Sequence, residues 1–303
     1  MRTTVGHFIM GKNMNTNNYK GKRPTTFEEQ VKILESRNMI IADRKEAAEI
    51  LSRVNYYRLS AYMLTFKSGD VFENGTTFTG VYELYEFDKR LRSICLNVLE
   101  SIEIAFRTQI SYMLSHKYGP MCYCNPEIFS NEQLHARLLE ELKSAIDKSH
   151  EQFIDHHKNN YDSQFPIWVV TEVVSFSQLS RLYSLLENKD KKEIADTYYK
   201  IPYTYFQSWI RSVSVLRNIC AHYGRLYNKT ISIKPKLFKQ DKDKGVLDHT
   251  VFGLIYVMGI INKDQAQWAR FIEDLRSLIE EYDLVELSKI GFPDNWDKLL
   301  CQL

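Results

Sequence analysis

The chain has 303 residues and a formal net charge of +2, so a partner rich in negative charge would have to bind a local patch. Apolar residues make up 44% of the chain and charged residues 26%, which is typical of a globular protein that can bury a core. The most apolar run, residues 251–261, has about half of the roughly 20 residues that a membrane helix requires. These values exclude a membrane-spanning helix and a protein that is basic throughout.

The cysteines and the N-terminal segment indicate the compartment. The five cysteines are odd in number, and three of them fall in apolar helical contexts, which is typical of a reducing environment. Residues 1–22 are polar and rich in asparagine, without the apolar stretch of a signal peptide. We therefore expect a soluble, cytoplasmic protein that makes no membrane contact and begins with a disordered or loosely ordered tail over residues 1–23.

Taken in chain order, the first two predicted elements are helices marked by their N-termini. Thr26 and Glu29 stand in the spacing of a capping box, in which each side chain bonds the backbone N–H of the other residue. Asp43 and Glu46 repeat this signal seventeen residues later. Helices are therefore expected to begin at about Thr26 and Asp43.

The clearest long helix is predicted over residues 81–118, where apolar side chains recur at spacings of three and four. Gly119 and Pro120 would end it, because glycine accepts the left-handed cap and proline cannot continue a helix. Before it, the aromatic segment 55–62 is expected to be helical and residues 67–80 to form a loop or small hairpin. Further helices are predicted over about 131–158, 166–187, 189–199, 203–223, 248–262 and 264–282, with a short one at the C-terminus.

Strand signals are nearly absent, with small pieces expected only near residues 64–78 and 230–234. The chain shows neither an internal repeat nor a linker rich in proline, glycine or serine. The sequence therefore predicts an all-α fold and a single domain over residues 24–303.

The segment 217–225, RNICAHYGR, ends the strongly amphipathic helix predicted from about residue 203. At 100° per residue Arg217 falls within the apolar stripe of this helix, whereas Arg211, Asn218 and His222 lie together on the opposite side. A charge on a core-facing stripe is costly unless it is paired or lines a cleft.

Arg217, Asn218 and His222 suit metal-independent cleavage of an RNA phosphodiester. Arginine clamps phosphate oxygens and neutralises their growing charge, and an imidazole both takes and gives a proton near neutral pH. Asn218 would orient the imidazole or a phosphate oxygen. One histidine does not easily serve as acid and base in one turnover, but a two-fold dimer would supply two of each group. The alternative is an arginine buried in a salt bridge beside an interfacial histidine.

Other charged residues are candidate supports of this site. Glu103 and Arg107 share a helix face, and Glu103 is the natural partner of Arg217 if their helices pack, although a surface pair is the alternative. Arg58 could contact phosphate or stay solvated. The five lysines of segment 234–244 could follow an RNA backbone or lie in a solvated loop.

Metal and cofactor signals are weak. The His156-His157 pair lacks a further ligand at helical spacing beyond Asp155, and the sequence contains no glycine-rich phosphate loop. We therefore predict that the protein uses no metal and no cofactor.

Extended to Asn228, the 217–225 segment resembles the signature of the Abi-like (AbiD/AbiF-type) abortive-infection proteins, which belong to the wider HEPN superfamily. The resemblance covers about 24–303, and Tyr223 stands where a second histidine is common in that signature. It includes the blocks 55–62, 84–92, 100–108, 118–120 and 291–296.

The resemblance implies a HEPN-like helical bundle with additional N- and C-terminal helices. It also implies a homodimer whose composite ribonuclease site is built from Arg217, Asn218 and His222 of each copy and leaves a 2′,3′-cyclic phosphate. Arg211, Arg225 and Arg58 would support the site or bind RNA. The implied role is phage defence or a toxin–antitoxin-like system, with RNA, including a structured non-coding RNA, as partner. The alternatives are a non-catalytic RNA-binding protein and a protein–protein adaptor.

Overall fold

The computed structural model describes residue 21 and residues 23–303. The tail expected over residues 1–23 lies outside the described residues, apart from those two positions. The described chain divides into two compact units. The first comprises residues up to Tyr56 together with Lys67–Phe78, and the second comprises Tyr57–Phe66 and Thr79–Leu303. The single domain predicted over residues 24–303 stays a prediction, because a division into units does not show whether they fold separately.

The first unit contains two helices and a hairpin, all predicted from local signals. Helix α1 (Phe27–Ser36) begins with the predicted capping box: Glu29 N donates to Thr26 Oγ1 at 3.2 Å, and Thr26 N donates to Glu29 Oε2 at 2.7 Å. Helix α2 (Arg44–Arg53) is capped by Asp43, but Glu46 does not return the bond, so the second predicted box is half formed. Strands β1 (Lys67–Ser68) and β2 (Val71–Phe72) form the expected hairpin.

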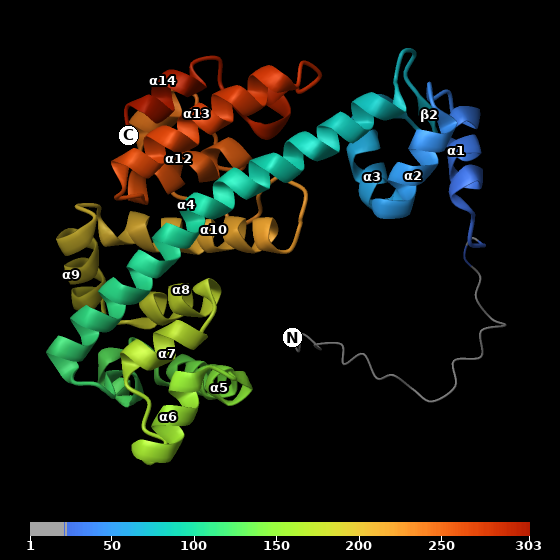
Figure 1. The fold of residues 1–303 in the computed structure, drawn as a ribbon. Helices are drawn as coiled ribbons and strands as arrows, with labels where there is room; N and C mark the ends of the chain where they lie inside the picture. Colours follow the sequence, from blue (N-terminus) through green and yellow to red (C-terminus); the bar gives the residue numbers. More distant parts are fainter. Residues whose placement is uncertain (1–20, 22) are drawn as a thin grey trace. The chain divides into compact units, whose positions relative to one another are not determined.

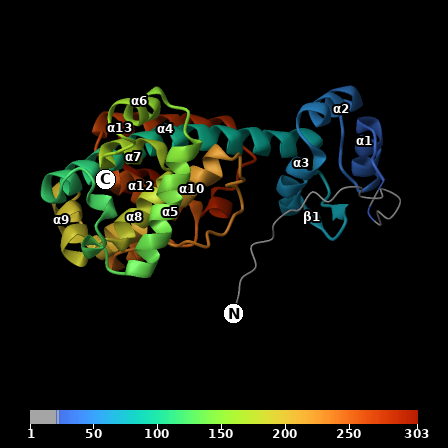
Figure 2. The same cartoon turned by 90° about the horizontal axis from the view of Figure 1, so that it is seen from below.

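The second unit is built along one long helix, α4 (Phe78–Tyr118), which begins three residues before the predicted start. At 1.5 Å per residue it is about 60 Å long. Figure 1 shows α4 running through this unit, and Figure 2 shows it end to end from below. As predicted, it stops where Gly119 adopts a positive φ of 87°.

Several helices of this unit are joined to α4 by side-chain contacts. Its helices are α3 (Tyr56–Met63), α5 (Glu132–Lys148), α6 (Gln152–Asn160), α7 (Ile167–Val173), α8 (Phe176–Leu185), α9 (Asn188–Tyr198), α10 (Tyr203–Ala221), α11 (Lys239–Asp243), α12 (Val251–Ile261), α13 (Gln265–Glu281) and α14 (Trp296–Cys301). Helix α13 bonds the first half of α4 through Gln267 and Asn97, and α9 bonds its end through Glu193 and Lys117.

An aromatic cluster holds α4, α8 and α10 together. Phe106 of α4 lies edge-on to Tyr183 of α8 and to Phe206 of α10, with ring centroids 5.6 and 5.7 Å apart. All three side chains are buried. Large buried rings contribute much of the hydrophobic stabilisation of a helical core. This cluster fixes the three helices from which the candidate site is built.

The all-α fold is confirmed, but two predicted helices are each broken in two. The helix expected over 131–158 is interrupted at residues 149–151. The helix expected over 166–187 ends at Val173, because Ser175 and Gln178 form a capping box that starts α8. Residues 230–234 form no strand, and the short helix α11 was not predicted.

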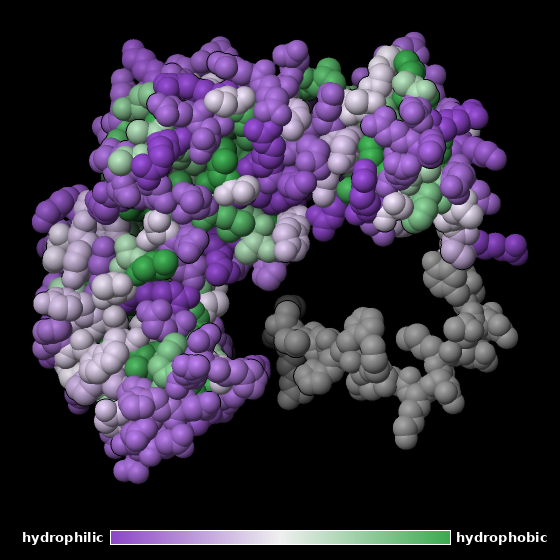
Figure 3. All heavy atoms as spheres, viewed as in Figure 1, coloured by the Kyte–Doolittle hydropathy of each residue, from purple (hydrophilic) through white to green (hydrophobic). Residues whose placement is uncertain are grey.

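Surface character varies little on the face drawn in Figure 3. Hydrophilic residues predominate there over the second unit, and hydrophobic residues appear in small separate groups. Among residues 23–303, no helix combines the length and the apolar character needed to cross a bilayer.

Candidate functional site

Helix α10 carries Arg217 and Asn218 in its last turns, and His222 is its C-cap. The predicted apolar stripe is buried as expected. Its members are Phe206, Trp209, Ile210, Val213, Leu216 and Cys220. Burial of this stripe against the core fixes the rotation of the helix about its axis. This rotation sets the direction in which the helical side chains of the 217–225 segment point.

Arg217 meets a buried carboxylate, as predicted. Its Nε lies 2.9 Å from Glu103 Oε2 on α4, and the Glu103 side chain is only 7% exposed. Arg107 pairs with the other oxygen, Glu103 Oε1, and also donates to the backbone oxygen of Thr171 on α7. Two guanidinium groups thus share one carboxylate and leave the cluster with one net positive charge. The Arg217 side chain keeps 32% of its surface exposed, so it lies at the edge of the core.

The surroundings of Asn218 and His222 differ from those of Arg217. Asn218 Nδ2 donates to Ser177 Oγ of α8 at 2.9 Å. His222 is exposed at the helix end. In the described part of the chain, no side-chain hydrogen bond joins His222 to Arg217 or Asn218. Within one copy the structure therefore brings together Glu103, Arg107 and Arg217, and leaves His222 outside that cluster.

A tight turn follows His222. Gly224 N donates to Ile219 O at 2.7 Å and Tyr223 N donates to Cys220 O at 3.2 Å, which is the hydrogen-bond pattern of a Schellman cap. Tyr223 occupies the left-handed position, with φ of 58°. Gly224 lies close to Ile219, because a Cβ there would lie 3.0 Å from Ile219 Cγ2 and 3.1 Å from Ile219 O. The turn fixes the backbone on both sides of His222.

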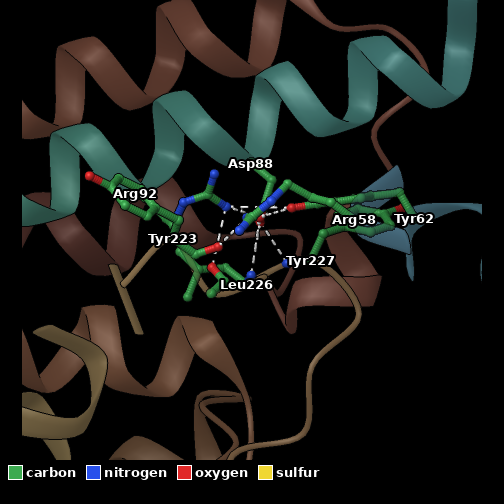
Figure 4. Close-up of polar contacts among 8 residues, drawn as sticks. Arg58, Tyr62, Asp88, Arg92, Tyr223, Leu226 and Tyr227 are labelled. Carbon is green, nitrogen blue, oxygen red and sulfur yellow. Dashed lines mark hydrogen bonds and ion pairs between the residues drawn. The ribbon is translucent and has the colours of Figure 1, made fainter. Parts of the chain in front are cut away.

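A buried aspartate anchors the chain beyond this turn (Figure 4). Asp88 of α4 accepts from Tyr227 N at 2.7 Å and from Leu226 N at 3.1 Å through Oδ1, and from the Tyr62 hydroxyl at 2.6 Å through Oδ2. Arg92, one turn further along α4, pairs with the same carboxylate. Burial raises the pKa of the Asp88 carboxyl, whereas these hydrogen bonds and the Arg92 charge lower it.

Three arginines bond backbone oxygens around the same turn. Arg58 Nη1 donates to Tyr223 O at 2.7 Å, and Arg92 Nη1 lies 3.3 Å from Gly224 O. Arg225 Nη1 donates to Ala61 O of α3 at 2.5 Å. Arg58 and Arg225 were expected to support the site or to bind RNA. The structure gives each of them a bond that holds the turn, and contact with RNA stays a prediction.

Asp88, Arg92 and Tyr62 were missed as site residues. A signal was present, since Asp88 stands on the apolar stripe of α4 between Leu84 and Leu91, and Arg92 follows at the i,i+4 spacing. A charge at such a position requires a partner. The partners that matter most are backbone N–H groups 138 and 139 residues away, which no side-chain pattern reveals.

Comparison with known proteins now identifies the family. A family model described as Abi-like protein matches residues 49–228. The chain belongs to the Abi-like family. Its name connects the family with abortive infection, and membership suggests a phage-defence role for this chain. Neither the curated proteins nor the solved structures contain a significant match.

The matched region of this Abi-like protein contains every residue of the cluster and of the turn. It begins within α2 and ends at Asn228, one residue after the backbone N–H that Asp88 binds. The region therefore ends where the anchored turn ends. Helices α11 to α14 lie outside it.

Arg211 lies apart from this cluster, in a basic pocket of about 340 Å³ beside the first turns of α10. Lys234 and Lys236 of the predicted lysine segment line the same pocket. The other three lysines of that segment do not. As for metals, residues 23–303 of this Abi-like protein contain no group of three His, Cys, Asp or Glu side chains placed to hold an ion.

We expect Tyr223→Gly to stabilise this Abi-like protein by about 1 kcal/mol, since a left-handed conformation costs an L-residue about 1–2 kcal/mol and glycine avoids this cost. The Tyr223 side chain is 69% exposed, so little packing is lost. Thermal denaturation would show a rise of about 2 °C. Tyr223→Ala is the control, because alanine keeps the conformational cost and should give no rise. A lower melting temperature for Tyr223→Gly than for Tyr223→Ala would contradict this account.

Proposed function

We propose that this Abi-like protein is a metal-independent endoribonuclease of an abortive-infection or toxin–antitoxin-like phage-defence system, acting on RNA in the cytoplasm. The observation that carries the proposal is the placement of Arg217 and His222 at one helix end. Arg217 is held by buried Glu103 yet remains partly exposed, and His222 is exposed on an anchored turn. An imidazole that transfers protons and a guanidinium that neutralises phosphoryl charge suit phosphodiester cleavage without a metal.

In the proposed reaction, His222 takes the proton from the ribose 2′-hydroxyl, and the 2′-oxygen attacks the adjacent phosphorus. The bond to the 5′-oxygen breaks, and a second His222 gives that oxygen a proton. The products are a 2′,3′-cyclic phosphate and a 5′-hydroxyl. Arg217 stabilises the negative charge that grows on the phosphoryl oxygens, while Asn218 orients the imidazole or one of these oxygens.

The second His222 comes from a second copy of the chain in this proposal. One copy contributes a single His222, and one imidazole does not easily serve as both the base and the acid of one turnover. An isologous dimer, as in the HEPN superfamily that the sequence resembles, would bring two of each group to one phosphate.

The first test is cleavage of a fluorescent single-stranded RNA by the parent protein in excess EDTA. We expect cleavage with a 2′,3′-cyclic phosphate on the 5′ product and no cleavage by His222→Ala. Equal cleavage by the parent and by His222→Ala, or a strict requirement for Mg²⁺, would contradict the assignment.

A mixing experiment tests the composite site. Parent and His222→Ala chains are mixed in equal amounts and allowed to exchange subunits. If a dimer needs both histidines, only the parent homodimers are active, and activity falls to about a quarter of that of the same total amount of parent protein. If each chain acted independently, the mixture would retain about half of the parental activity. That result would exclude a site shared between two chains. Light scattering of the parent gives the oligomeric state in the same buffer.

The second candidate function is RNA binding without cleavage, for example of a structured non-coding RNA. The ion pair of Arg217 with Glu103 favours it, because a guanidinium already held by a carboxylate is less free to clamp a phosphate. This function predicts tight, salt-dependent binding in which the RNA is recovered intact.

A further inference from the structure

The pocket beside the first turns of α10 is lined by positive charge from two directions. Its walls are Thr204, Gln207, Ser208 and Arg211 of α10 and Ser232, Ile233, Lys234 and Lys236 of the following segment. Three of these eight residues carry a positive charge and none carries a carboxylate. Like charges that face one pocket repel each other, and a bound anion relieves that repulsion.

The segment that carries the lysines is firmly held. Lys236 N donates to Ser208 Oγ at 2.9 Å, and Trp209 Nε1 donates to Lys236 O at 2.5 Å. Further along, the ring of Phe238 stacks on that of Tyr205, with centroids 4.1 Å apart. The backbone at Lys236 is therefore fixed against α10, and its position does not depend on a ligand.

Buried and exposed residues alternate along the segment that carries the lysines, and the lysines are among the exposed ones. Along residues 231–237, Ile231, Pro235 and Leu237 are buried, whereas Ser232, Lys234 and Lys236 are exposed. Ser232, Lys234 and Lys236 line the pocket together with Ile233, while the buried Ile231, Pro235 and Leu237 attach the segment to the core.

Few negatively charged side chains pair with these cations. Asp248 Oδ1 lies 4.0 Å from Lys234 Nζ and 3.5 Å from His249 Nδ1. Among the described residues, Arg211 and Lys236 form no ion pair. The pocket also lies beside the N-terminal turns of a 19-residue helix, where the helix dipole favours an anion.

The pocket and the motif lie on one stripe of α10. Thr204, Ser208 and Arg211 are followed at spacings of three and four by Val215, Asn218 and His222. At 1.5 Å per residue, Arg211 lies about 16 Å along the helix axis from His222. A strand whose scissile bond lies at His222 would have to span about this distance to reach the pocket.

We propose that this pocket, through Arg211, Lys234 and Lys236, binds backbone phosphates of the RNA strand at a distance from the bond that is cleaved. The proposal rests on the proposed function, and it makes the substrate an extended strand that lies along α10. Phosphate contacts of this kind set the position of a strand without reading its sequence. The pocket therefore raises affinity for long single strands of any sequence.

Binding of a fluorescent single-stranded RNA to the full chain, measured by anisotropy over a range of salt concentrations, tests this proposal. The His222→Ala background keeps the RNA intact. Arg211→Gln and Lys236→Gln should each weaken binding about 5- to 10-fold and lower the slope of log K against log salt by about 0.7, the value for one phosphate contact on a single strand. Lys143→Gln, at an exposed position of α5, is the matched control and should change neither quantity.

The outcomes separate the pocket from the ribonuclease. If Arg211→Gln and Lys236→Gln bind RNA with the affinity and salt slope of Lys143→Gln, the pocket proposal is wrong even where the parent cleaves RNA. If the parent never cleaves RNA but both variants lose affinity and slope, the pocket stands and the ribonuclease assignment falls. A free mononucleotide or pyrophosphate that binds in the pocket while RNA affinity is unaffected by Arg211→Gln would also overturn the proposal.

Discussion

Asp88→Ala should lower the free energy of unfolding by about 3–5 kcal/mol, because it leaves the buried Arg92 guanidinium without its negatively charged partner. The Arg92 and Asp88 side chains are 5% and 0% exposed, so water does not replace the missing carboxylate. The backbone N–H groups of Leu226 and Tyr227 and the Tyr62 hydroxyl lose their acceptor as well. Thermal denaturation should show a fall of about 10 °C.

Two matched variants test the cause of this loss. Asp274→Ala removes an exposed aspartate of α13 and should change stability by less than about 0.5 kcal/mol. Asp88→Asn keeps an oxygen for the two N–H groups but removes the charge that faces Arg92, so we expect an intermediate loss. If Asp88→Ala and Asp274→Ala melt within a degree of each other, Asp88 does not anchor the turn.

Arg217→Lys should abolish most cleavage and leave stability nearly unchanged. A lysine can keep the ion pair with Glu103, but it lacks the planar fork that holds two phosphate oxygens. Loss of a group that stabilises charge in the transition state lowers the rate about 10²- to 10³-fold. The measurement is single-turnover cleavage of the same RNA in EDTA, together with the melting temperature.

Arg217→Ala should lose at least as much activity and should also lose stability, because Glu103 then keeps only Arg107 as a partner. Arg276→Lys is the control: Arg276 forms an ion pair with Asp297 far along the chain from the 217–225 segment, and cleavage should stay within about twofold. Parental cleavage rates in both Arg217→Lys and Arg217→Ala would show that Arg217 has only a structural role. In that case the stabilisation of phosphoryl charge assigned to Arg217 in the proposed reaction would be wrong.

The parts of the fold that were predicted correctly depend on neighbours in sequence. The cap at Thr26 and the stop at Gly119 each arise from backbone groups within four residues, so the residue types suffice to reveal them. The unpredicted break before α8 shows the limit. The spacing of Ser175 and Gln178 was a capping box, but apolar residues continued at helical spacing across it and favoured one long helix.

For the candidate site, the sequence by itself indicated the groups: a guanidinium on the core-facing stripe of α10, an imidazole at its end, and Glu103 as the carboxylate partner if the two helices packed. The packing of α4 against α10 then decided in favour of that ion pair. Helical periodicity is a local property, so it was enough to place these groups on their faces. Only the tertiary structure decided that Asp88 anchors the turn after His222 and that Lys234 and Lys236 join Arg211 in one pocket. The first contact is made to backbone N–H groups, which every residue except proline carries, and the second depends on how an irregular segment folds back on α10. Neither arrangement can be predicted from a pattern of residue types in the sequence.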